Sequence, residues 1–198
     1  MLKDKDFKIV TLIALILLVC SGIVFAAEDG FVAVKKIPGK HFTVFLESGV
    51  DVPALSKLLD IGSSERLLAG KSTETGFSPE QELADMVDTI FIRVCDILDM
   101  RLYSFEGDIK ICRDNRRLGL VYRDLFGRDL NPTRAFYAQE LNILYVSAQD
   151  FKSGILGHEI AHAVMSRYFV VQPSVKIQEI LSGYVEYQLR KSPNTGPS

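Results

Sequence analysis

Gly157-His158-Glu159-Ile160-Ala161-His162 (GHEIAH) is the stretch of sequence that says most about the fold. Its two histidines are four residues apart, and residues four apart on a helix lie on one face, one turn above the other. Both imidazoles can therefore reach the same ion. Glu159 is rotated from them by about a hundred degrees, so its carboxylate borders the ion and is free to accept a proton. The spacing predicts a helix that carries a zinc site, with Glu159 as the general base.

A chance match on a solvated helix is the alternative explanation for this motif. The residues around it argue against that explanation, because seven of its neighbours are uncharged: Ile155, Leu156, Ile160, Ala161, Ala163, Val164 and Met165. A buried helix with two histidines and a glutamate needs partners for them, since an unpaired buried polar group costs several kcal/mol. A metal ion supplies that partner directly, so we expect one zinc ion per chain.

A catalytic zinc site needs a third protein ligand and keeps its fourth position for water. No histidine follows the motif, and His41 is far upstream. The candidates are Glu179 and Glu186 on the next expected helix. A short connection around Pro173 predicts that the two helices pair antiparallel, which favours Glu179, and Gly183 would leave room for their close approach. Glu186 remains the alternative ligand, and a solvated polar face is the other explanation for both glutamates.

Two stretches, GILGHEIAHAVMSRYF (154–169) and IQEILSGYVEY (177–187), resemble the gluzincin metallopeptidases, especially their smallest members and the bacterial peptidase-MA-like proteins. In that family a second helix with a Glu-x-x-Ala/Ser-x-Tyr pattern supplies the third zinc ligand. The pattern reads Glu179 to Tyr184 here, with Ile180 where the family often has glycine. Residue by residue, the resemblance is confined to these C-terminal stretches.

This resemblance implies a zincin-like fold in which His158, His162 and Glu179 hold zinc and a peptide is hydrolysed. It also implies that Asn142–Ser147 is the edge strand of the sheet, along which an extended peptide or protein substrate binds through main-chain hydrogen bonds. A further donor is required for the oxyanion. The candidates are Tyr168, Tyr184, Tyr187 and His41, although packing explains each of them more simply.

Hydrophobic periodicity predicts an α+β domain over residues 27–191, with a small mixed sheet, a long supporting helix and a C-terminal helical pair. Strands are expected at 40–47, 108–113, 135–138 and 142–147. Helices are expected at 52–59, 64–68, 78–100, 153–168 and 175–189, and a helix or a helical loop at 115–126. Ser78, Pro79 and Gln81 form an N-terminal capping box for the long helix. The Pro/Gly/Ser-rich tail at 192–198 is expected to be disordered.

The N-terminus has the pattern of an export signal. Lysines dominate the first eight residues, and an uncharged apolar run follows from residue 9 to residue 27. We expect residues 1–26 to be a signal peptide that is cut after Ala26, giving a periplasmic or secreted domain. The alternative is an uncleaved anchor that attaches the chain to the inner membrane through residues 9–27, with the domain outside the cytoplasm.

Composition adds few constraints on partners. Hydrophobic residues make up 47% and charged residues 24% of the 198 residues, as in ordinary globular proteins. The net charge of −2 provides no argument for nucleic-acid binding. Export permits a disulfide between Cys95 and Cys112, and two buried free thiols are equally compatible with the sequence. The alternative function is a non-catalytic zinc-binding envelope protein, a chaperone or binding module, which would not need Glu159.

Overall fold

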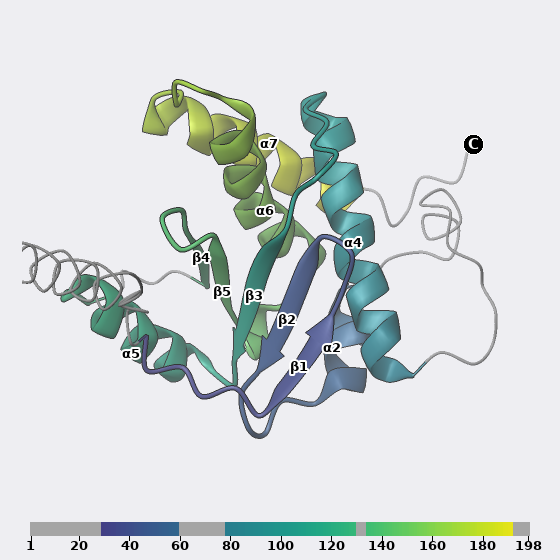
Figure 1. Ribbon diagram of the computed structural model, residues 1–198, viewed down its shortest axis with the longest axis vertical. Coiled ribbons are helices and arrows are strands. Elements are labelled where there is room, and N and C mark those ends of the chain that lie inside the picture. The colour runs from purple at the N-terminus through teal and green to yellow at the C-terminus, as the bar shows by residue number, and fades with distance from the viewer. Residues whose placement is uncertain (1–28, 60–77, 130–133, 192–198) are drawn as a thin grey trace, which may run out of the picture.

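The computed structural model describes residues 29–59, 78–129 and 134–191, which are coloured in Figure 1. These residues form the expected α+β fold, with five strands, five helices and one 3-10 turn. In chain order the elements are β1 Lys35–Pro38, β2 Phe42–Leu46, α2 Val52–Leu59, α4 Pro79–Leu98, β3 Gly107–Cys112, α5 Asn115–Phe126, β4 Ala135–Ala138, β5 Ile143–Ser147, η1 Ala148–Asp150, α6 Ser153–Tyr168 and α7 Val175–Lys191. The leader at 1–26, the helical piece expected at 64–68 and the tail at 192–198 lie outside the described residues.

The strands form one mixed sheet in the order β1-β2-β3-β5-β4. The three central strands are parallel, and β1 and β4 pair antiparallel at the two edges. The expectation that Asn142–Ser147 is the edge strand is therefore wrong, because β5 lies between β3 and β4. The burial of β5 explains its place: Leu144 to Ser147 are buried in succession, as in a strand that is covered on both faces.

Helices cover the sheet unequally. Figure 1 shows α5 apart from α2, α4, α6 and α7. The main core lies between the sheet and the larger helical layer, and includes Ile109, Ile111, Leu144 and Val146 from the central strands. A smaller core joins the opposite face of the sheet to α5 through Cys112, Leu118, Val121, Phe136, Ala138 and Tyr145. Successive residues of a strand point to opposite faces, so β3 and β5 contribute to both cores.

The supporting helix α4 begins where the capping residues predict. Ser78 is in an extended conformation, and its Oγ accepts a hydrogen bond of 3.2 Å from the Gln81 amide. The Gln81 side chain donates to Asp85 Oδ1 at 3.3 Å instead of returning to Ser78, so only half of the expected capping box forms. The helix ends at Leu98, before Asp99 in the left-handed conformation (φ 53°).

Close packing of α6 against α7 depends on glycines in α6. A Cβ at Gly157 would lie 2.0 Å from Leu189 Cδ1, and one at Gly154 would lie 2.9 Å from Arg190 Cγ. The expectation for Gly183 is wrong, since a Cβ at that position would meet no heavy atom within 4 Å. The room for close approach therefore comes from the glycines of α6.

Cys95 and Cys112 are free and buried. Cys95 belongs to the main core and Cys112 to the smaller core, so the two thiols lie on opposite sides of the sheet. Burial raises the pKa of Cys95 to about 11 and that of Cys112 to about 12. Within the described ranges, no helix is long and apolar enough to cross a membrane.

Candidate metal centre

Helix α6 carries both histidines of the motif on one side. Its buried residues, among them Ile155, Leu156, Ile160 and Val164, pack against the main core. His158 and His162 are half-buried at its boundary, where the side chains lie one turn apart. Their Nε2 atoms are 3.3 Å from each other. The two imidazoles therefore converge on one point, as the four-residue spacing predicts.

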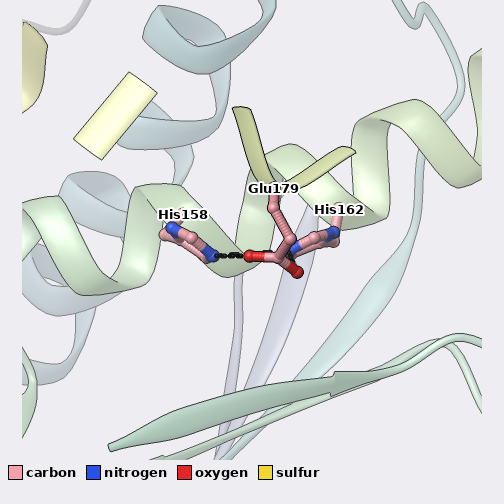
Figure 2. Close-up of side chains that lie close together, drawn as sticks. All are labelled: His158, His162 and Glu179. Atoms are coloured by element: carbon pink, nitrogen blue, oxygen red, sulfur yellow. Dashed lines mark hydrogen bonds and ion pairs between the residues drawn. The ribbon is translucent and has the colours of Figure 1, made fainter. Parts of the chain in front are cut away.

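Helix α7 brings Glu179 to the same point, as Figure 2 shows. Glu179 Oε2 is 3.5 Å from His158 Nε2, and Glu179 Oε1 is 3.4 Å from His162 Nε2. Two atoms bonded at about 2.1 Å to a tetrahedral zinc ion lie about 3.4 Å apart. The three side chains are thus spaced as ligands of one such ion. Among the described residues they form a group that could hold a metal, because their ligand atoms all lie within 4.8 Å of one another.

Glu186, the alternative ligand, contacts the other side of His158. Its Oε2 lies 3.3 Å from His158 Nδ1, a buried atom that has no well-oriented hydrogen bond among the described residues. Its other oxygen, Oε1, forms an ion pair with Arg190 one turn further along α7. Glu186 therefore faces the nitrogen that an Nε2-bound metal leaves free, which is the place of a carboxylate that orients a histidine ligand.

Glu159 lines the same cavity as the three candidate ligands. This cavity has a volume of about 400 Å³, and its walls come from α6, α7 and the edge strand β4: Ala135, Phe136, Tyr137, Gln139, His158, Glu159, His162, Gln178 and Glu179. Burial raises the pKa of Glu159 to about 8, and the negative charge of Glu179 adds to this, while a hydrogen bond from the Tyr137 backbone opposes it.

The charges in the cavity suit a bound cation. Glu159 and Glu179 line it together, and none of its described wall residues is a lysine or arginine. Burial lowers the pKa of His162, and the neighbouring His158 lowers it further, which favours the neutral imidazole that can ligate a metal. Two imidazoles and a carboxylate match the donor set of a catalytic zinc site. The residues present therefore fit a zinc ion.

Two contributions to this site are absent from the sequence-based prediction. The side chain of Gln178 hydrogen-bonds to His162 and also donates to the Pro173 carbonyl at 2.9 Å. The backbone of Tyr137 bonds to Glu159 from β4. Gln178 could have been found from the sequence, because it directly precedes the candidate ligand Glu179. A backbone donor from a strand has no signature in the sequence.

The four candidates for an oxyanion donor do not line the cavity. His41 is buried elsewhere, with its ring stacked on Phe91 and its Nδ1 3.3 Å from the Phe105 carbonyl oxygen. Tyr168, Tyr184 and Tyr187 are about half exposed on α6 and α7. No protein-family model, curated protein or solved structure matches the chain.

Proposed function

We propose that this protein is an exported zinc metallopeptidase, with a zincin-like site in which His158, His162 and Glu179 hold the ion. The observation that carries the proposal is the set of distances of 3.3–3.5 Å between the two Nε2 atoms and the Glu179 oxygens. A protein that only stored zinc would have no need for a further carboxylate in the cavity. Glu159 supplies that carboxylate, so an enzyme is favoured over a binding module.

The chain's own residues divide the chemistry between them. A bound zinc ion polarises a substrate carbonyl and makes a water molecule more acidic. Glu159 accepts the proton of the attacking water and later delivers it to the leaving amine, which completes the hydrolysis of the peptide bond. The Tyr137 backbone holds the Glu159 carboxylate at the cavity wall, and Gln178 and Glu186 orient the two imidazoles.

The substrate in this proposal is a peptide in extended form. The edge strand β4 runs along the cavity through Ala135, Phe136 and Tyr137, and β5 occupies only one of its two sides. The other side of an edge strand has main-chain groups that can pair with another chain. A peptide added there would pass the candidate zinc ligands, with its scissile bond near Glu159.

Two glutamine variants test the division of labour. Glu159→Gln is nearly isosteric and is expected to retain zinc and fold but to lose at least about 10²-fold in peptide hydrolysis, as expected for a lost general base. Glu179→Gln is expected to bind zinc more weakly, because a neutral amide is a poor zinc ligand. Zinc titration and peptide hydrolysis on both variants separate the roles. Normal hydrolysis by Glu159→Gln would exclude the mechanism, and zinc binding without hydrolysis in the wild type would favour the binding module.

Export is the part of the proposal that depends on residues 1–27. Cell fractionation and N-terminal sequencing are expected to give a product outside the cytoplasm that begins at Ala27. A full-length membrane-bound product would favour the anchor, and a cytoplasmic product would exclude both versions.

A further inference from the structure

The outward side of α5 combines positive charge with apolar surface. Arg116, Leu120, Arg123 and Phe126 follow one another at spacings of four, three and three residues, so they lie along one side of the helix. We call these four residues the α5 outer face. Both arginines are exposed and have no ion-pair partner among the described residues. Phe126 is 45% exposed at the edge of this face, where its ring also contacts Tyr122 and Phe136. The opposite side of α5 packs into the smaller core through Leu118 and Val121.

This positive charge stands out against the rest of the chain. The segment 113–128 contains five arginines and two aspartates, whereas the whole chain has a net charge of −2. Arg117 is the one of these five that pairs with a buried acid, since its guanidinium bonds to Glu47 Oε1 at 2.8 Å. Arg113 and Arg128 are exposed beyond the two ends of the helix, and Arg113 forms an exposed ion pair with Asp114 at 3.4 Å. A local basic surface on an acidic protein attracts an anionic partner.

The described chain begins beside this helix. Asp29 accepts a hydrogen bond of 2.7 Å from the Tyr145 hydroxyl and pairs with Lys110, and the Gly30 carbonyl accepts one of 2.9 Å from Arg117. Phe31 packs against the smaller core. Only Glu28 separates this point from the apolar run at residues 9–27. In the proposed export route that run interacts with the membrane until the expected cleavage after Ala26, so the domain emerges with α5 next to the bilayer surface.

We propose that the α5 outer face docks on the anionic surface of a membrane. Arginines next to an anionic leaflet gain favourable charge interactions, and Leu120 and Phe126 can enter the interfacial layer. The smaller core on the α5 side and the helices α6 and α7 lie on opposite faces of the sheet. Docking through α5 therefore leaves the candidate metal centre uncovered. This inference does not require the site to be catalytic.

A single tryptophan makes the docking measurable, because the chain contains none. Phe126→Trp places the reporter on the α5 outer face. Tyr103→Trp is the matched control, since Tyr103 is 92% exposed on the loop between α4 and β3. That loop lies at the top of Figure 1, whereas α5 lies at the lower left. The exported protein is purified with the N-terminus it carries and mixed with vesicles of phosphatidylcholine alone or with phosphatidylglycerol.

The emission of the Phe126→Trp variant is expected to shift to the blue with phosphatidylglycerol vesicles only and to return at high salt, while the emission of the Tyr103→Trp variant does not change. When Arg116→Gln and Arg123→Gln are added to the Phe126→Trp variant, the concentration of anionic lipid needed for the same shift is expected to rise about 30-fold. Equal emission with both lipids, an equal shift in the Tyr103→Trp control or no effect of the arginine changes would overturn the proposal. A response to an acidic polypeptide but not to vesicles would also overturn it, and would assign the face to a protein partner.

Discussion

The two glutamates of α7 contact different nitrogens of His158. Glu179 faces Nε2 and Glu186 faces Nδ1, at 3.5 Å and 3.3 Å. A metal bound to Nε2 leaves Nδ1 as the atom that a second carboxylate can orient. The two side chains therefore have separate roles in the proposed site, although both are acidic residues near one histidine.

Glu186→Gln is expected to weaken zinc binding by about 10–100-fold without unfolding the protein, because loss of an orienting carboxylate typically has an effect of this size. Competition with a zinc chelator measures the affinity. Tyr187→Phe is the control, since it changes an exposed neighbour on α7. Unchanged zinc affinity in Glu186→Gln would contradict the orienting role, and complete loss of binding would make Glu186 a ligand.

Asp29 links the start of the described chain to the sheet and makes stability depend on pH. Burial opposes its ionisation, but hydrogen bonds from Lys110, Tyr145 and the Phe31 amide hold the pKa of Asp29 below its ordinary value. A depressed carboxyl pKa contributes stability above the ordinary pKa, and this contribution disappears as the pH falls through the folded-state pKa.

Asp29→Asn is therefore expected to lower the free energy of unfolding by about 1–3 kcal/mol at pH 7. The difference in the free energy of unfolding between Asp29→Asn and the wild type should shrink in acid, where the Asp29 carboxyl of the wild type also becomes uncharged. Urea denaturation at pH 7 and at about pH 3 measures both values. Asp129→Asn, at an exposed position, is the control. A deficit that stays constant with pH would show that the charge of Asp29 is not the cause.

Most of the candidate site follows from local spacing. His158, Glu159 and His162 come from a single helix, so the four-residue period is enough to predict their arrangement. The choice between Glu179 and Glu186 depends on how α6 and α7 are aligned along each other. The sequence favours one alignment but does not determine it. The Tyr137 backbone contact depends on which strand lies beside α6, and packing between distant parts of the chain decides that.

Among the strands of the described residues, β1 is the one that the sequence analysis does not predict, whereas the other edge strand, β4, has the bounds expected for it. β1 reads Lys-Lys-Ile-Pro, which has one buried residue and no alternating pattern. Lysine and proline are typical of an edge strand, and β1 lies at an edge. β5 begins with the uninterrupted apolar run Ile-Leu-Tyr-Val, which is typical of a strand that is covered on both faces, and this run favours an internal place in the sheet over an edge.

Gly157→Ala tests the contact between α6 and α7. The new methyl group would meet Leu189, a side chain that is 2% exposed and has little room to move. Overpacking of this kind is expected to lower the free energy of unfolding by about 1–3 kcal/mol. Gly183→Ala on the facing helix is the control, and is expected to stabilise by up to about 1 kcal/mol through helix propensity. Chemical denaturation compares them, and equal effects at both positions would refute the packing assignment.

On the scale of the whole molecule, the sheet separates two cores, each with one cysteine. Cys95 and Cys112 are buried with raised pKa values, so both are poor nucleophiles in the folded protein. In the exported protein neither is expected to form an intramolecular disulfide or to react with a thiol reagent until the chain unfolds. Peptide mapping after labelling with and without denaturant measures each site. A Cys95–Cys112 crosslink in the native protein would contradict this arrangement of the two cores.

The metal content of the purified protein tests the central claim most directly. Elemental analysis is made on wild type and on a His158→Ala, His162→Ala double variant, both purified without chelator. The account predicts one zinc ion per chain in the wild type and none in the double variant, because both Nε2 ligands are lost. Zinc retained undiminished by the double variant, or a wild-type protein that cannot bind zinc, would contradict it.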